Sequence, residues 1–390
     1  MAESEPRHSS RLPAYLRIGD LLKSRILSGI YKPNEFLPAE RDLAREFSAS
    51  RQTIRLALEA LIRDELIVPE QGRGTRVVLR RAQTETSAEY EKPAFNLAAL
   101  IIYGVHREGS AAILQGSQAV MRKADHHLIV SETSSEMPTR AADEASHLRT
   151  LIDKQIGGII IYAEPTDQNR ALIAEAILKG IQVVQIDRFL PGLDCDYVGI
   201  DNAAAARDMV RHLMKLGHRR IAFLSVLPEA SSVKERLEGY SLALADFGMN
   251  ESDHIVASCA SFSDPCGELN NILDNWLALE NPPTAIFAAH DGLALGIMQM
   301  LRERNIQVPG EISVAGFDDL YASRMVIPSL TTVQQPFKAL GEMAAHMLID
   351  RLSGRYTGPP RRVHLPTQIM TRESTGIVNT VRASNAVLAK

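Results

Sequence analysis

The sequence has few cysteines and no cluster of metal-ligating residues. Of its 390 residues only three are cysteine, Cys195, Cys259 and Cys266, and their spacing matches no zinc-binding pattern. So few thiols are typical of a reduced, partly buried set in the cytosol. We therefore expect neither a metal site nor a disulfide framework.

Long apolar runs are also missing. No window reaches the ~18 consecutive apolar residues that a membrane span needs. The start, Met1-Ala-Glu-Ser-Glu-Pro-Arg7, carries two acids and lacks the apolar core of a signal peptide. We expect a cytoplasmic protein that has no membrane partner.

The sequence motifs of common enzyme classes do not occur either. There is no nucleophile elbow and no Walker loop, and Gly72-Arg-Gly74 and Gly157-Gly158 are too short to be phosphate loops. We predict a protein with no enzymatic activity and no cofactor.

What is present is an ordinary globular composition with an uneven charge. Hydrophobic residues make up 45% and charged residues 23%, and the length predicts two to three domains. Residues 1–81 hold 15 Lys and Arg against 11 Asp and Glu, whereas the remainder holds 28 against 36. A basic head on an acidic body fits a nucleic-acid contact confined to the head.

The pattern of the head predicts a winged helix-turn-helix over residues 12–79, after a mobile N-terminus at 1–11. Helices are expected from Leu12 to about Ser28, from Pro38, and from Ser50 to about Asp64, with Ser50 as the N-cap of the third. A hairpin follows, with Gly72 and Gly74 supplying its bend.

The third helix carries side chains suited to a DNA major groove. Arg51 and Arg55 are four residues apart and so share one face, away from the apolar stripe of Ile54, Leu58 and Leu61. Arginine can bond guanine through two atoms, glutamine can pair with adenine, and threonine can touch a thymine methyl group. We predict a recognition helix that reads bases with its first turns.

These residues resemble the GntR family of bacterial regulators. The matching motifs are Leu37-Pro-Ala-Glu-Arg41, Ser50-Arg-Gln-Thr53, Arg55 and Gln71-Gly-Arg-Gly-Thr75. The resemblance implies that the wing enters the minor groove, and a cation at its tip, Arg73, suits that groove. The DNA-binding residues expected are Arg41, Ser50, Arg51, Gln52, Thr53, Arg55, Gln71, Gly72 and Arg73.

The body, from residue 96 to 376, follows a polar linker at 80–95 and precedes a tail at 377–390. Its short apolar runs alternate with helical stretches, which predicts an α/β fold with doubly wound parallel sheets. The strands are too many for one sheet of this kind, so two lobes are expected. Lobe 1 would take about 96–199 and 334–360, and lobe 2 about 200–333 and 361–376. A ligand would bind between them, at the carboxyl ends of the strands.

Seven ordered motifs of the body are similar to the effector domain of LacI/GalR repressors, which has a type I periplasmic-binding-protein-like fold. They include Ile186-Asp-Arg188, Arg236-Leu-Glu-Gly-Tyr240 and Ile312-Ser-Val-Ala-Gly-Phe-Asp-Asp319. The resemblance implies effector contacts by Asp187, Arg236, Phe262, His290, Asp291, Asp318 and Gln335. Carboxylates and a guanidinium can bond adjacent sugar hydroxyls, while an aromatic ring covers the sugar's apolar face.

Two departures from the LacI pattern affect the mechanism. His290 stands where an asparagine is expected; it is either a packed, hydrogen-bonded histidine or an effector contact whose titration would change binding near pH 6–7. Residues 80–95 do not read as a LacI hinge helix, so that route of induction does not carry over. The whole arrangement resembles arabinose-type repressors that join a GntR head to a LacI-type body.

The favoured function is a dimeric repressor of carbohydrate-use genes, released from palindromic double-stranded operator DNA by a sugar or sugar derivative. A higher oligomer, an activator of the same architecture, and a solute-binding protein are the alternatives. A pentose or hexose is the default effector. A polyol or a phosphorylated sugar is a further option, and in the second case Arg107 in the loop 104–110 would be the first phosphate partner to suspect.

Overall fold

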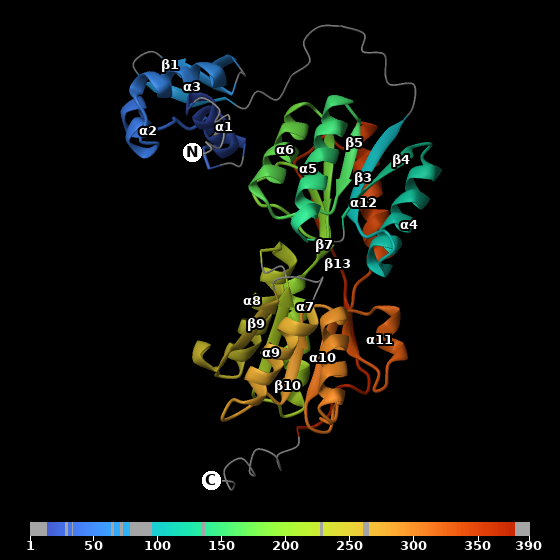
Figure 1. Cartoon of the computed structure of the whole chain (residues 1–390). Helices are drawn as coiled ribbons and strands as arrows, with labels where there is room; N and C mark the ends of the chain where they lie inside the picture. The colour runs from blue at the N-terminus through green and yellow to red at the C-terminus, as the bar shows by residue number, and fades with distance from the viewer. Residues whose placement is uncertain are drawn as a thin grey trace, which may run out of the picture. The chain divides into compact units, whose positions relative to one another are not determined.

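The computed structural model describes residues 14–27, 30–32, 34–63, 66–70, 73–78, 96–134, 137–226, 229–259 and 265–378. The chain divides into a small N-terminal head and a larger body (Figure 1). The expected N-terminal segment 1–11, linker 80–95 and most of the tail 377–390 lie outside the described residues, as do the predicted contacts Gln71, Gly72 and Phe262.

The head contains three helices and a two-stranded hairpin. They are α1 (Ala14–Leu27), α2 (Glu40–Glu46), α3 (Arg51–Arg63), β1 (Ile67–Glu70) and β2 (Gly74–Val77). Strands β1 and β2 pair antiparallel. The apolar residues Leu22, Leu43, Ile54 and Leu61 meet in one buried cluster, which holds the helices against the hairpin. This arrangement confirms the winged helix-turn-helix expected from the sequence.

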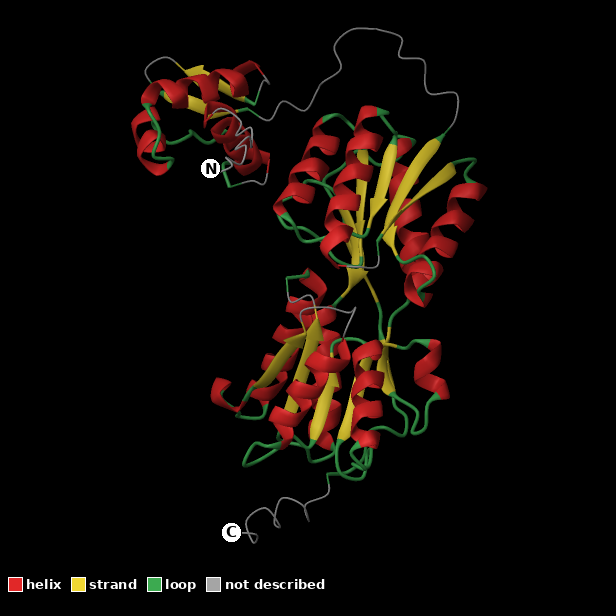
Figure 2. Cartoon of the chain, viewed as in Figure 1, coloured by secondary structure: helices red, strands yellow, loops and turns green. Residues whose placement is uncertain are grey.

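The body is built from two sheets flanked by helices (Figure 2). The strands of the first lobe are β3 (Leu97–Tyr103), β4 (His127–Thr133), β5 (Gly158–Ile161), β6 (Gln182–Ile186), β7 (Asp196–Ile200) and β13 (Arg362–Leu365). Its helices are α4 (Glu108–Lys123), α5 (Met137–Asp153), α6 (Asp167–Leu178) and α12 (Phe337–Leu352). Strand β5 is buried along its whole length, which explains its unbroken Gly-Ile-Ile-Ile sequence.

The second lobe repeats the plan. Its strands are β8 (Ile221–Val226), β9 (Ile255–Cys259), β10 (Ala285–Ala288), β11 (Ser313–Asp318), β12 (Thr331–Gln334) and β14 (Gln368–Met370). Its helices are α7 (Asn202–Lys215), α8 (Ser231–Asp246), α9 (Pro265–Leu277), α10 (Asp291–Glu303) and α11 (Tyr321–Met325), with a short 3-10 turn at Glu251–Asp253. Helix α7 begins where Asp201 Oδ1 accepts a hydrogen bond from the Ala204 N–H at 2.9 Å.

Strand order places the ligand-binding edges. The first sheet runs β13-β7-β6-β5-β3-β4 and the second runs β14-β12-β11-β10-β8-β9. In each sheet the winding direction reverses beside the first strand, at β3/β5 and at β8/β10. Ligands of open parallel sheets bind outside the carboxyl ends of the strands at such reversal points. The two-lobed doubly wound fold was predicted correctly.

The lobe boundary differs from the expected one. Strand β13 pairs with β7 in the first lobe, from Arg362 against Tyr197 to Leu365 against Ile200, whereas residues from 361 onward were expected in the second lobe. After β13 the chain returns to the second lobe at β14, which pairs antiparallel with β12. Without β13, strand β7 would be the edge of the sheet and its outer N–H and C=O groups would be unpaired; β13 bonds them. No motif in the sequence signals that pairing.

Candidate DNA-reading face and effector cleft

The predicted reading face of α3 is exposed. Arg51, Gln52 and Arg55 lie on the surface, while Ile54 on the opposite face is fully buried. Arg55 donates through Nη2 to Glu40 Oε2 at 3.1 Å, so α2 restrains the direction of this side chain. A cation held in this way needs less ordering when it meets DNA.

Ser50 and Thr53 form the start of α3. The Ser50 Oγ accepts the Thr53 N–H at 3.1 Å and lies 2.8 Å from the Thr53 Oγ1, as the predicted N-cap requires. Arg41 is exposed on α2 and lies 3.5 Å from Asp42 Oδ1. Arg73 is exposed in the turn between β1 and β2, where its N–H bonds the Glu70 carbonyl at 3.0 Å. That these residues contact DNA stays a prediction.

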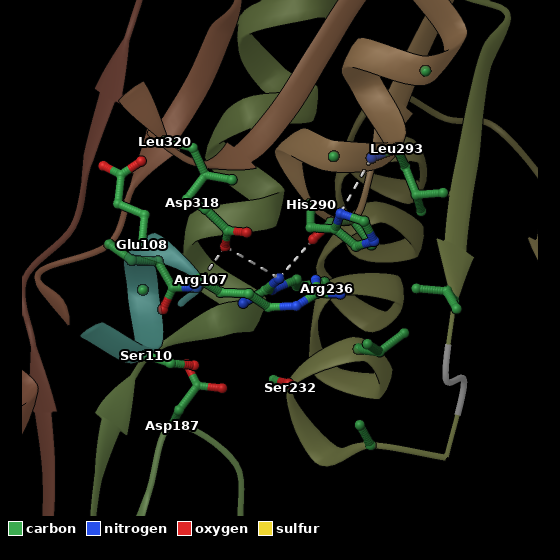
Figure 3. A pocket seen from close by; sticks show the side chains of 18 of the residues that line it. Arg107, Glu108, Ser110, Asp187, Ser232, Arg236, His290, Leu293, Asp318 and Leu320 are labelled. Atoms are coloured by element: carbon green, nitrogen blue, oxygen red, sulfur yellow. Dashed lines mark hydrogen bonds and ion pairs between the residues drawn. The ribbon is translucent and has the colours of Figure 1, made fainter. Parts of the chain in front are cut away.

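A cavity of about 660 Å³ lies in the body, at the carboxyl ends of strands from both lobes. Five of the predicted effector residues line it: Asp187, Arg236, His290, Asp318 and Gln335. Figure 3 shows Arg236, His290 and Asp318 facing Asp187 and the segment from Arg107 to Ser110 across this space. Residues far apart in the sequence therefore meet around one site.

On the second-lobe side, Arg236 is a buried anchor of α8. Its Nε donates to Asn202 Oδ1 at 2.9 Å and its Nη1 donates to the Ala289 carbonyl at 2.6 Å. Its guanidinium carbon lies 3.7 Å from the centre of the Phe317 ring, and Asp318 Oδ1 lies 4.0 Å from Nη1. These contacts hold the guanidinium plane rigidly at the cavity wall.

Asp318 ends β11 and faces the crossover to α12. Gln335 donates through Nε2 to Asp318 Oδ1 at 2.8 Å, while the buried Gln335 Oε1 has no hydrogen-bond partner among the described residues. Asp318 has φ of 127° and Asp187 has φ of 66°, both in the left-handed region that side chains rarely adopt. Strain of this kind concentrates at binding sites, where the surrounding fold maintains it.

Asp291 lies outside the cavity, contrary to the expectation that it contacts the effector. It is fully buried at the start of α10, and its carboxylate accepts from the Leu320 N–H at 2.8 Å, from Ser323 Oγ at 2.6 Å and from Thr332 Oγ1 at 2.5 Å. The carboxylate thus ties α10 to α11 and β12. Being next to His290 in the sequence does not bring Asp291 to the cavity, because adjacent residues at a helix start point in different directions.

Comparison with known proteins matches both parts of the chain. Residues 14–77 match the model of the bacterial regulatory proteins of the gntR family, and residues 210–375 match the periplasmic binding protein-like domain. The arabinose metabolism transcriptional repressor of Geobacillus stearothermophilus is 26% identical over 372 residues, which cover 93% of this chain and 98% of that protein. The HTH-type transcriptional regulator DegA of Bacillus subtilis is 32% identical over 241 residues, covering 61% of this chain and 69% of DegA.

The chain belongs to the GntR–LacI-type transcriptional regulators.

Solved structures agree with this fold. The transcriptional regulator CelR in complex with cellobiose superimposes with a TM-score of 0.68 at 22% identity, covering 93% of this chain and all of that one. A LacI family regulator from Enterococcus faecium with bound ribose gives a TM-score of 0.62 at 23% identity and covers 73% of this chain. No helix in the described part of this GntR–LacI-type regulator is long and apolar enough to cross a membrane.

The structure adds cavity residues that the sequence did not assign. Arg188 follows Asp187 in the chain, and Arg140 reaches the same wall from α5; both are almost fully buried. Arg188 belongs to the motif Ile186-Asp-Arg188, but the prediction from this motif named only Asp187. Nothing near Arg140 in the sequence marks it, because α5 reads as an ordinary amphipathic helix. Within the described residues no group of three or more His, Cys, Asp or Glu could hold a metal ion.

The surroundings of His290 favour the packed, hydrogen-bonded histidine over a pH switch. His290 is the N-cap of α10, and its Nδ1 accepts the Leu293 N–H at 3.2 Å. Burial, and to a smaller extent the nearby cations Arg236 and Arg107, lowers the pKa of His290 to about 3. We therefore expect a neutral imidazole near pH 7, where its titration would not control effector binding.

Asp318 should lower the free energy of unfolding as the pH rises towards its raised pKa. Burial raises its pKa to about 8, with Asp291 and Asp187 adding to the effect and Arg236 and Gln335 opposing it. The unfolded carboxyl titrates near pH ~4, so ionisation favours the unfolded chain increasingly between about pH 4 and pH 8. Asp318→Asn removes this titration.

The melting temperature of Asp318→Asn relative to the unmodified protein should therefore rise from pH 5 to pH 8 and then level off. Thermal unfolding of both proteins at unit pH steps measures the difference. A difference that stays constant across this range would contradict the raised pKa of Asp318.

Proposed function

We propose that this regulator represses carbohydrate-use genes and leaves its operator when a sugar or sugar-derived effector fills the cavity of the body. The observation that carries the proposal is the set of polar side chains at the cavity: Asp187 from the first lobe, Arg236 and Asp318 from the second, and Gln335 from the crossover. Sugar hydroxyls donate and accept at once, so they suit adjacent carboxyl, guanidinium and amide groups.

The relatives support the same assignment. The relative that matches over 93% of this chain is named as a repressor of arabinose metabolism. The exposed face of α3 fits a head that reads one half-site, and a homodimer would present two heads to a palindromic operator. The lobe arrangement suits an effector that bonds both walls and thereby favours one separation of the lobes.

Release of the operator should be reciprocal. If an effector lowers operator affinity by some factor, operator DNA must lower effector affinity by the same factor. Fluorescence anisotropy of a labelled operator, titrated with pentoses, hexoses, polyols and their derivatives, tests the release directly. Calorimetric titration of the effector with and without operator tests reciprocity, and equal effector affinities in the two titrations would refute the mechanism.

Asp187→Asn should weaken this release. The substitution preserves the shape of the side chain, and asparagine tolerates the positive φ of 66° at this position. Losing a hydrogen bond to a charged group should raise the effector concentration needed for half-release ~10-fold or more. Operator affinity without effector should stay unchanged.

The matched control is Asp208→Asn, which removes an acid whose side chain is 64% exposed on α7. It should release as the unmodified protein does. Equal half-release concentrations for Asp187→Asn and Asp208→Asn would remove Asp187 from the site.

Transcripts of the target genes should rise in cells that lack the regulator, and a fall would instead indicate an activator.

A further inference from the structure

Three arginine side chains gather around one ring in the first-lobe wall of the cavity. The guanidinium carbons of Arg140, Arg107 and Arg188 lie 4.1, 5.7 and 5.7 Å from the centre of the Tyr103 ring. All four residues line the cavity. They come from the end of β3, the turn after it, helix α5 and the end of β6, so only the folded lobe brings them together.

The two carboxyl groups near these arginines, Glu164 and Glu144, differ in how much of the positive charge they offset. Glu164 Oε1 accepts from Arg140 Nη1 at 3.3 Å and from Arg188 Nη2 at 3.0 Å, so one oxygen serves two guanidinium groups. Burial and the charge of Glu164 together raise the pKa of the neighbouring Glu144 to about 8. Glu144 is therefore largely protonated at pH 7 and contributes little negative charge.

The remaining acids of this wall have other surroundings. Asp187 adds one negative charge at the cavity, beside Arg188. Glu108 is exposed, and its Oε2 accepts a hydrogen bond at 2.7 Å from the N–H of Tyr321, which begins α11 in the second lobe. Figure 3 shows Asp187 across the cavity from Asp318 and His290. At the first-lobe end, three guanidinium groups therefore line the cavity, and the carboxylates of Glu164 and Asp187 lie beside them.

Arg188 also has a buried donor without a hydrogen-bond partner among the described residues. Its side chain is only 4% exposed, and this donor is its Nε. Its guanidinium carbon lies 4.2 Å from the centre of the Tyr162 ring, which fixes the plane of the group. A buried, preoriented N–H donor costs free energy until an acceptor reaches it. Helix α4 also begins at this wall, and its N-terminus favours negative charge.

We propose that the effector is a carbohydrate that carries a carboxylate or phosphate group. Its anionic group binds at the first-lobe end beside Arg188 and Arg107, and its hydroxyls meet Arg236, Asp318 and Gln335. This assignment rests on the proposed function, since it concerns the same cavity. Arginine suits both anions, because its planar fork matches the spacing of their oxygens.

Matched pairs of ligands test the proposal on the full chain. Isothermal titration calorimetry would compare galactose with galacturonate, glucose with glucuronate and with glucose 6-phosphate, and arabinose with arabinose 5-phosphate. At least one acid should bind ten times more tightly than its neutral parent, and whether it is a uronate or a phosphate identifies the anion. The proposal is overturned if a sugar binds and no acid of the panel binds more tightly than its neutral parent.

Variants locate the anionic group. Arg188→Gln should reduce the preference for the acid over its neutral parent, measured as the ratio of their two affinities. Arg122→Gln, which changes an exposed arginine at the other end of α4, should leave both affinities unchanged. If Arg188→Gln does not fold, Arg107→Gln at a half-buried position serves in its place. An undiminished preference for the acid in these variants overturns the assignment.

The outcomes separate this proposal from the proposed function. A neutral sugar that binds and releases the operator, without any tighter acid, overturns the anionic effector and leaves the sugar-released repressor in place. An acid that binds tightly but leaves operator affinity unchanged supports the anion site and overturns the release mechanism. If no member of the panel binds, both the carbohydrate effector and the anion site fail.

Discussion

Arg51→Ala should lower the affinity for a specific operator by ~10- to 100-fold, the range expected for losing one arginine contact to a base edge. Arg51 is the first residue of α3, and its side chain is exposed. The apolar stripe that holds the helix is formed by Ile54, Leu58 and Leu61, which are 0, 5 and 1% exposed. The substitution should therefore leave the head folded.

An operator selected from random DNA by the unmodified protein provides the probe, and anisotropy titrations at fixed salt measure the affinity. Arg45→Ala removes an exposed arginine from α2, which lies 3.6 Å from Asp42 and is not among the predicted contacts. It should cost little beyond a weak electrostatic effect. Circular dichroism would confirm that both variants are folded. Equal operator affinities for Arg51→Ala and Arg45→Ala would refute the reading helix.

Gly116→Ala should destabilise the body by about 2 kcal/mol or more, because overpacked cores lose typically 1–3 kcal/mol and here the clash is with backbone. A Cβ atom at Gly116 would lie 2.1 Å from the Lys338 carbonyl oxygen of α12, and one at Gly341 would lie 2.1 Å from the Ile113 carbonyl of α4. The helices touch backbone to backbone, and Ser117 Oγ donates to the Gly341 carbonyl at 3.1 Å.

The control for this substitution is Gly296→Ala in α10. There the new methyl group would meet only Leu269 Cδ1 at 3.5 Å, an ordinary contact. Alanine is the better helix former by about 1 kcal/mol, so this variant should be neutral or slightly more stable. Thermal unfolding of both variants gives the comparison. A Gly116→Ala protein that melts with or above Gly296→Ala would show that α4 and α12 separate at little cost.

The close packing of α4 against α12 also connects two parts of the cavity wall, because both helices begin at the cavity. Helix α4 begins at the cavity wall, and α12 begins two residues after Gln335, which also lines the cavity. Two helices that meet through glycines can slide or separate only by losing this contact. A ligand that bonds Arg107 and Gln335 together would therefore act on one rigid pair of helices.

Much of the fold could be predicted from local pattern. The continuous apolar run Gly158–Ile161 and the amphipathic repeat of α3 can each be recognised from a few adjacent residues. Strands β7, β9, β12, β13 and β14 and the short helix α11 were not predicted. They lack a continuous apolar run like that of β5, so the neighbours they pair with decide their structure.

The cavity was predicted only in part. Asp187, Arg236, Asp318 and Gln335 were found because each stands at a fixed place in a motif, and the structure brings them to one cavity. Arg140 was missed because α5 shows no motif. Asp291 was included because His290-Asp291 matches an Asn-Asp pair in the LacI/GalR resemblance, yet its carboxylate bonds groups of α11 and β12. Burial and hydrogen-bond partners separate these cases, and neither can be read from spacing.

The sequence by itself determined the kind of protein this is: a helix-turn-helix head of one family, a two-lobed α/β body of another, and a regulator that combines them. Period, turn residues and motif order are local, and they survive in the linear chain. Only the tertiary structure decided that His290 is a neutral helix cap, that β13 returns to the first lobe, and that three arginines from distant segments surround Tyr103. These features depend on burial and on contacts between remote segments, which exist only once the chain has folded.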